Sequence, residues 1–350
     1  MEGTMKAALF EDINKISVKE VPIPKVGPRD ALIRVKACAI CGSDLKIFHN
    51  GHKLITFPAI TGHEFAGEVV EVGPEAKVFK VGDRVSVGCD VSCGICRNCK
   101  NGSATHCATP HAFGHDIGGG FAEYCLLPSY SIEGGPVHHL PDHVSYEEGA
   151  LAEPLACIIN GLENTKIKLG DTVVIIGAGA IGCLMIQLVK NLGAKKVILI
   201  QRSKKRLEMA KQMFNADVYI SSQEEDVIAR VLEETDGMGA DVVITTNQSP
   251  ETHVQALDMC RVRGTICLFG GMVKGTYPKD FDTNKIHYKE LFVVGAHGSN
   301  SRQHQLAVDL IASGVVKVKD VISEKFELDQ IEEAFACTES HKGFRNFIIP

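Results

Sequence analysis

The sequence contains no run of about 18 apolar residues, the length that a membrane-spanning helix requires. Residues 1–10 lack the basic segment, long apolar stretch and small-residue cleavage site of a secretory signal. Basic residues are also in the minority, because 37 lysines and arginines against 43 acidic residues leave a formal net charge of -6. This charge argues against a nucleic-acid or anionic-membrane partner. We therefore expect a cytoplasmic protein with no membrane or nucleic-acid partner.

Internal repeats, low-complexity tracts and long linkers are absent as well. What is present is 350 residues of which 45% are hydrophobic, enough to bury a large core. A chain of this length favours about two domains.

Cysteine is abundant, with 13 residues. The odd count, the missing signal and the C-x-x-C spacings favour metal binding in a reducing compartment over disulfides. Cys157, Cys183, Cys260 and Cys267 lie in apolar surroundings, so we interpret them as small core residues.

The first part of the chain is typical of short strands and turns. Residues 31–36 and 68–72 alternate between apolar and polar side chains, and turn signals occur at 26–28, 72–74 and 81–83. This pattern predicts a β-rich, barrel-like domain.

The pattern changes near Ser145, which has capping-box spacing with Glu148 and predicts the start of a helix. Pro154 interrupts that helix or opens the next one at its first turn. Strands and helices then alternate, and continuous apolar strands between helices indicate a parallel sheet covered on both faces. The predicted strands are 172–176, 196–200, 241–245, 264–269 and 291–294, and the predicted helices are 180–192 and 204–214.

After about residue 297 the pattern reverts to a helix at 303–313 followed by strand-like pieces ending at 347–349. We expect this tail to pack on the first domain. The predicted domains are therefore residues 1–155, with 298–350 returning to them, and residues 156–297.

Four cysteines follow the spacing C-x2-C-x2-C-x7-C: Cys93, Cys96, Cys99 and Cys107. Four thiolates this close in sequence can close a tetrahedral shell around a structural Zn2+. An iron–sulfur cluster is the alternative, but bacterial ferredoxins have a last gap of three residues and a following proline. Free thiols are the third interpretation. Cys89 lies just outside the set, and no adjacent basic helix suggests a DNA-binding zinc finger.

A second group contains Cys41, His63, Glu64 and the distant Glu153. Thiolate, imidazole and carboxylate all bind Zn2+, and a catalytic site needs three ligands and an open position. Each residue alone is also compatible with a structural role, His63 as an interior hydrogen-bonded residue and Glu153 as a helix-end charge. Their occurrence beside the four cysteines and a dinucleotide motif favours the catalytic interpretation.

Residues 173–176 form an apolar strand that leads directly into a G-x-G-x-x-G motif opening a helix. Its glycines permit a tight turn and close approach of the backbone to a pyrophosphate, and the helix N-terminus offers amide donors. The predicted cofactor-binding residues in this turn are Gly177, Gly179, Ala180, Ile181 and Gly182.

The next predicted strand ends in Gln201-Arg202-Ser203 rather than in the acid that holds the ribose hydroxyl of NAD. No carboxylate there repels a 2′-phosphate, and Arg202 could pair with one, assisted by Ser203 and a lysine. This favours NADP over NAD. The alternative is that these residues only begin a solvated helix.

Together these motifs resemble the zinc-dependent medium-chain alcohol dehydrogenase superfamily, in its sorbitol (polyol) dehydrogenase branch, over essentially the full length. The matching segments are residues 41–44, 62–64, 118–124, 153–155 and 177–182, together with the four-cysteine spacing.

The resemblance implies an α/β fold with a GroES-like β-rich catalytic domain and a Rossmann domain with a doubly wound parallel sheet. It also implies that Cys41, His63 and either Glu64 or Glu153 hold a catalytic zinc. Ser43 occupies the relay-hydroxyl position, and a homodimer or homotetramer is expected.

The predicted activity is reversible oxidation of a secondary alcohol of a polyol or sugar derivative to a ketone, with hydride transfer to NAD(P). Alternatives are a dehydrogenase of simple alcohols, amino alcohols or sugar acids and, from another class, a non-catalytic nucleotide-binding protein. Two departures weaken a sorbitol assignment: Lys46 stands where the branch commonly has histidine, and the sequence around His297 lacks an expected arginine–tyrosine pair.

Overall fold

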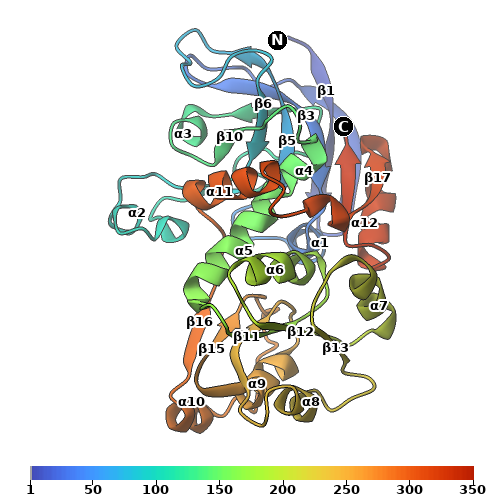
Figure 1. Ribbon diagram of the computed structural model, residues 1–350. Coiled ribbons are helices and arrows are strands. Elements are labelled where there is room, and N and C mark those ends of the chain that lie inside the picture. The colour runs from blue at the N-terminus through green and yellow to red at the C-terminus, as the bar shows by residue number, and fades with distance from the viewer. Residues whose placement is uncertain (1) are drawn as a thin grey trace. The chain divides into compact units, whose positions relative to one another are not determined.

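The computed structural model describes residues 2–350, which divide into two compact units (Figure 1). The first unit holds the described residues up to Ala156 together with Gly298–Pro350, and the second is Cys157–His297. Within the described residues, no helix combines the length and apolar character needed to cross a membrane.

Short strands dominate the first unit. In chain order they are β1 (Thr4–Asp12), β2 (Lys15–Pro22), β3 (Ala31–Ala39), β4 (Ala59–Ile60), β5 (Glu64–Val72), β6 (Arg84–Val87), β7 (Asp90–Val91), β8 (His111–Ala112), β9 (Tyr124–Leu127), β10 (Val137–His139), β17 (Ile322–Glu327) and β18 (Arg345–Ile349). They form a three-stranded sheet β2-β1-β4, a β7-β8 pair and a seven-stranded sheet in the order β10-β6-β5-β3-β18-β17, with β9 beside β3. The predicted β-rich domain is confirmed.

Strand β3 is central to this unit, since it pairs antiparallel with β5, β9 and β18. Its side chains are buried except at Arg34 and Lys36. The pairing of Phe347 with Ala39 adds the C-terminal strand to the same sheet, as expected for the tail. The start of β5 and the end of β3, which carry the metal-type residues, are thereby fixed side by side.

The helices of the first unit are short, and most connect strands. They are α1 (Gly42–Asn50), α2 (Arg97–Lys100), η1 (Ala104–His106), α3 (Ser129–Ile132), α4 (Tyr146–Ala150), α11 (Ser301–Ala312), η2 (Val318–Val321), η3 (Leu328–Gln330) and α12 (Ile331–Glu339). Ser145 caps α4 by accepting from the Glu148 amide, as the capping-box spacing predicts. Helix α5 (Ala152–Thr165) begins directly afterwards and carries Pro154 in its first turn.

The second unit is a parallel sheet between helices. Its strands are β11 (Thr172–Ile176), β12 (Lys196–Gln201), β13 (Val218–Ser221), β14 (Ala240–Thr245), β15 (Cys260–Leu268) and β16 (Phe292–Gly295), and its other helices are α6 (Ala180–Asn191), α7 (Lys204–Met213), α8 (Val227–Glu233), α9 (Pro250–Met259) and α10 (Thr283–Lys289). The order β13-β12-β11-β14-β15-β16 is doubly wound, and every pairing is parallel.

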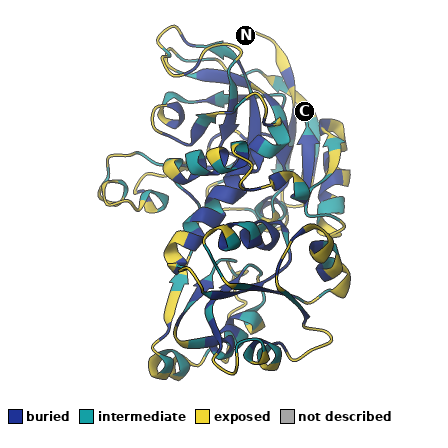
Figure 2. Ribbon diagram, viewed as in Figure 1, coloured by how far each residue is buried: buried dark blue, intermediate teal, exposed yellow. Residues whose placement is uncertain are grey.

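Helices cover both faces of this sheet, with α6 and α7 on one side and α8 and α9 on the other (Figure 1). The central strands are dark blue in Figure 2, and all five residues of β11 are buried. Burial on two faces explains the continuous apolar runs. Strand β13 and helices α8–α10, which the sequence pattern did not single out, complete the predicted sheet.

Candidate catalytic metal centre and cofactor site

Cys41 follows β3 and caps the N-terminus of α1. Its amide donates to the Asp44 carboxylate at 2.8 Å, and Asp44 is fully buried. Burial opposes ionisation of the Cys41 thiol, but the Arg345 charge and the hydrogen bond with His63 outweigh it and hold the pKa well below its ordinary value. A thiolate is the form of cysteine that binds metals.

His63 and Glu64 lie at the start of β5, after a turn that needs glycine. Gly62 has a φ of 88°, and a Cβ there would lie 2.8 Å from Cys38 Sγ and 2.9 Å from the Phe121 ring. Both metal-type side chains are buried, with exposed fractions of 5% for His63 and 0% for Glu64. The close packing of Gly62 against Cys38 and Phe121 therefore fixes the backbone position from which the His63 and Glu64 side chains extend.

The candidate ligand atoms of Cys41, His63 and Glu64 all lie within 4.8 Å of one another. Asp44 Oδ1 is 3.4 Å from His63 Nδ1, and Ser43 Oγ is 3.1 Å from His63 Nε2. A carboxylate beside one ring nitrogen is the usual orienting partner of a metal-binding histidine. This arrangement assigns Nδ1 to Asp44, and Nε2, which Ser43 Oγ approaches, is the nitrogen that would bind a metal.

Arg345 is a charged residue of this site that the sequence analysis missed. It is 7% exposed, its Nη2 lies 3.1 Å from Glu64 Oε1, and its Nη1 donates to the Ile40 carbonyl at 3.2 Å. Burial lowers the Arg345 pKa, but the negative charges of Glu64 and Cys41 raise it by a larger amount. The guanidinium therefore stays charged. In the sequence, the only indication of a special role was that this charged residue begins the apolar strand Arg345–Ile349.

The donor set fits a divalent cation. Glu64 Oε2 is buried without a hydrogen-bond partner, and Glu64 Oε1 has only the ion pair with Arg345. Burial also raises the pKa of Glu64 well above its ordinary value, although Arg345 opposes this. Unpartnered acceptors in a buried site are costly, and a bound cation would satisfy them.

Glu153 is close to this group without belonging to it. The carboxyl is 5% exposed, and burial raises its pKa to about 7, opposed by His63 and reinforced by Cys41. Its oxygens are not among the ligand atoms that lie within 4.8 Å of one another. Glu64 is therefore the carboxylate that the geometry places with Cys41 and His63.

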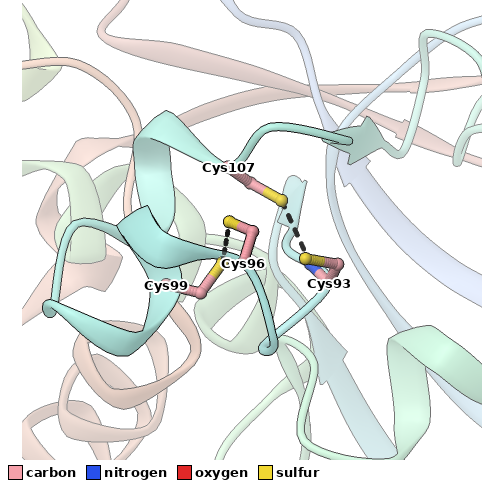
Figure 3. A group of neighbouring side chains, drawn as sticks. All are labelled: Cys93, Cys96, Cys99 and Cys107. Carbon is pink, nitrogen blue, oxygen red and sulfur yellow. Dashed lines mark hydrogen bonds between the residues drawn. The ribbon is translucent and has the colours of Figure 1, made fainter.

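The four-cysteine cluster is shown in Figure 3. Its sulfur atoms also lie within 4.8 Å of one another, with Cys96 and Cys99 Sγ 3.4 Å apart and the Cys93 amide 3.3 Å from Cys107 Sγ. Backbone hydrogen bonds lower the Cys93 pKa to about 6, which favours its thiolate. Tetrahedral Zn2+ holds thiolates about 3.8 Å apart, so the cluster needs little change to bind it.

The glycine-rich turn joins β11 to α6, and three side chains form hydrogen bonds with its backbone. The Ala178 amide donates to Gln201 Oε1 at 2.9 Å, and Arg206 Nε donates to the Ala178 carbonyl at 2.9 Å. The Thr246 hydroxyl donates to the Gly177 carbonyl at 3.2 Å. The first amides of α6 follow directly, as a pyrophosphate site requires.

Beside this turn lies a cavity of about 630 Å³ within the second unit. Three of the predicted cofactor residues line it, namely Gly177, Gln201 and Arg202, whereas Gly179, Ala180, Ile181, Gly182 and Ser203 are not among its lining residues. Acidic side chains, including Glu225 and Asp226, line it as well.

Comparison with known proteins identifies two family models in the chain. Residues 27–142 match the alcohol dehydrogenase GroES-like domain, and residues 180–313 match the zinc-binding dehydrogenase family. A D-arabitol-phosphate dehydrogenase of Enterococcus avium is 33% identical over 96% of this chain and 93% of its own length. An L-threonine 3-dehydrogenase of Pyrococcus furiosus is 36% identical over 92% of both. The chain belongs to the zinc-dependent medium-chain alcohol dehydrogenases.

A solved structure of a zinc-binding dehydrogenase from Sinorhizobium meliloti 1021, bound to NADP, agrees with this. Its TM-score is 0.92 at 32% identity, over 99% of this chain and 100% of that one. The dehydrogenase described here is thus zinc-dependent, uses NAD(P) and acts on an alcohol or polyol. The alternative of a non-catalytic nucleotide-binding protein is set aside.

The structure also shows the contacts and burial of other residues that the sequence analysis named. The Ser203 hydroxyl caps α7 by accepting from the Arg206 amide, and Lys204 forms an ion pair with Glu224 at 2.7 Å. Cys157 is only partly buried, whereas the other three cysteines assigned to the core are buried. His297 is exposed, and its carbonyl accepts from Asn160.

Proposed function

We propose that this dehydrogenase reversibly oxidises a secondary alcohol group of a polyol or sugar derivative to a ketone, with hydride transfer to NAD(P). The observation that carries the proposal is the convergence of Cys41, His63 and Glu64 beside the Ser43 hydroxyl. The similarity to an arabitol-phosphate dehydrogenase supports a polyhydroxylated substrate.

Zinc bound by Cys41, His63 and Glu64 would supply Lewis-acid activation of an alcohol oxygen. Ser43 Oγ, 3.1 Å from the His63 ring, is the hydroxyl positioned to relay the alcohol proton, accepting it while its own hydroxyl proton passes on to solvent. Asp44 and Arg345 hold His63 and Glu64 in position. Glu153, with a pKa of about 7, is a second carboxyl that can exchange a proton near neutral pH.

An amino alcohol is the second candidate substrate, because the threonine dehydrogenase from Pyrococcus furiosus is 36% identical to this chain. A polyol is our first choice because, unlike an amino alcohol, it carries no ammonium group that would require an additional negatively charged side chain in the site.

For the cofactor we propose NADP in preference to NAD. The supporting observations are the neutral Gln201 at the end of β12 and the exposed Arg202 on the cavity wall. A guanidinium there can pair with a 2′-phosphate, and no carboxylate at position 201 repels one.

We further propose a homodimer or homotetramer and a cytoplasmic location. The supporting features are the exposed apolar strand β16 and the thirteen cysteines, none of which is in a disulfide.

The experiment that tests the function is replacement of Cys41 by alanine in protein reconstituted with zinc. We expect two zinc ions per wild-type chain, one per Cys41→Ala chain, and loss of NAD(P)-linked oxidation of polyols by more than about a thousandfold. Zinc content is measured by atomic absorption and turnover by nicotinamide absorbance.

Cys89→Ala is the matched control, because Cys89 is a buried cysteine that belongs to neither cluster. It should keep two zinc ions and near-normal turnover. Full activity of Cys41→Ala with one zinc per chain would exclude the proposed site.

A further inference from the structure

A line of three imidazoles leads from the metal centre to the surface of the first unit. The His63 and His115 rings are 6.0 Å apart, and the His115 and His52 rings meet edge to face at 4.9 Å. His63 is buried, His115 is half-buried and His52 is exposed. The proposed reaction uses only His63, so the roles of the other two are open.

Backbone hydrogen bonds determine which nitrogen of each ring carries a proton. His115 Nδ1 lies 3.2 Å from the Phe113 carbonyl, which can only accept, so Nδ1 is the protonated atom and Nε2 is an acceptor. His52 Nδ1 accepts from the Leu54 amide at 3.3 Å, so Nε2 of that ring is the donor.

These two hydrogen bonds describe neutral rings, each with a single N–H. Partial burial, followed by His115 and Lys53, lowers the pKa of His52. The neighbouring pair therefore offers one hydrogen-bond acceptor and one donor.

From this geometry we infer that His115 and His52 recognise a hydroxyl group of the substrate beyond the reacting carbon, and so select an uncharged polyhydroxylated chain. A hydroxyl both donates and accepts, and it matches His115 Nε2 and the His52 Nε2–H together. A phosphate or carboxylate offers acceptors only and leaves His115 Nε2 facing another acceptor. The inference rests on the proposed polyol dehydrogenase function and adds its specificity-determining residues.

The test compares sorbitol, a sorbitol phosphate and 2-butanol as substrates of the zinc-loaded enzyme. In the His115→Leu variant we expect KM for sorbitol to rise about tenfold with kcat nearly unchanged, because a single hydrogen bond is lost. The kinetics with 2-butanol, which has no second hydroxyl, should stay at wild-type values. His115→Gln, which restores an acceptor, should recover part of the affinity.

His52→Leu should give a similar rise, and the double variant should lose less than the product of the two single losses, since both residues contact one hydroxyl. His139→Leu, an exposed histidine on β10, is the matched control and should leave all three substrates unaffected. Zinc content and Tm are measured for each variant.

Three outcomes separate the inference from the function on which it rests. Equal losses with sorbitol and 2-butanol in His115→Leu would overturn the inference and leave the dehydrogenase function standing. A wild-type preference for the phosphorylated polyol would also overturn it. Absence of turnover with every alcohol, in protein holding two zinc ions, would reject the proposed function itself.

Discussion

Gln201 stands at the position where the charge of one side chain can decide between two cofactors. Its Oε1 accepts from the Ala178 amide at 2.9 Å, so the side chain supports the glycine-rich turn while carrying no charge. Arg202 follows it on the wall of the same cavity. A carboxylate at position 201 would bind the ribose hydroxyls of NAD and repel a 2′-phosphate.

We expect Gln201→Glu to shift the ratio of kcat/KM values from NADP toward NAD by about 10- to 100-fold, the worth of a charged hydrogen bond. Glutamate has the shape of glutamine and can still accept from Ala178, so the fold of the turn should be unaffected. Steady-state kinetics with both cofactors measures the shift.

Gln212→Glu adds the same charge at an exposed position of α7 and serves as the control. If Gln201→Glu left the cofactor ratio at the wild-type value, residue 201 would not set the preference, and the proposed role of Arg202 would lose its main support.

The residues of the metal centre were predictable to different degrees. Cys41, His63 and Glu64 have side chains that bind metals and lie beside glycine-containing turns, so local sequence singled them out. Arg345 could not be found in this way, because it meets the Ile40 carbonyl across 305 residues of chain. Only the pairing of β18 with β3 brings it there. Likewise, the sequence left Glu64 and Glu153 as alternatives, and the distances favour Glu64.

At the scale of elements, predictions succeeded where hydrophobic periodicity was strong. Strand β11 and helix α6 have the predicted positions because a strand buried on both faces and a helix opening after glycine leave clear patterns. Helices α8 and α10 have seven residues each, which is too short for two full periods of an apolar stripe. Their existence depends on packing against the sheet rather than on local pattern.

Helix α11 illustrates an element whose packing has a consequence for stability. Its His304 is fully buried, and Nε2 lies 3.3 Å from Ser86 Oγ. The Ser86 hydroxyl donates to the Gly149 carbonyl at 2.7 Å, so it can accept from His304. The His304 ring also stacks on His138 at 5.2 Å. Burial, followed by the effect of His138, lowers the His304 pKa well below 6.5.

This depressed pKa predicts a loss of stability in acid. Below about pH 6.5 the unfolded chain binds a proton at His304 that the folded chain does not. The free energy of unfolding should therefore fall with decreasing pH, by up to about 1.4 kcal/mol per pH unit from this residue. Above pH 6.5 the residue is neutral in both states and contributes no slope.

His304→Gln removes the titrating group while its amide can still donate to Ser86. Urea unfolding between pH 5 and 8 should show a smaller acid slope for this variant than for the wild type. His143→Gln, at an exposed histidine that bonds the Ala312 carbonyl, should keep the wild-type slope. Identical slopes for His304→Gln and the wild type would show that His304 does not titrate on unfolding.

At the scale of the whole molecule, the parallel sheet of the second unit ends in strand β16, which pairs with β15 alone among the described strands. Phe292 is 57% exposed and Val293 is 37% exposed, although both are large apolar residues. An apolar strand with an unpaired edge tends to pair with another chain unless it is protected. A second copy related by a twofold axis would cover both the edge and these side chains.

We therefore expect the purified dehydrogenase to be a dimer or tetramer and Phe292→Asp to weaken its association about 100-fold. Each copy would lose the burial of one aromatic side chain. Because a twofold interface contains this side chain from both copies, the loss occurs twice per dimer. Sedimentation velocity over a range of concentrations measures the change. Leu169→Asp makes the same kind of substitution at a side chain that is 88% exposed and outside β16, so it should leave the mass unchanged. A monomeric wild type, or Phe292→Asp assembling like the wild type, would show that β16 is not the interface.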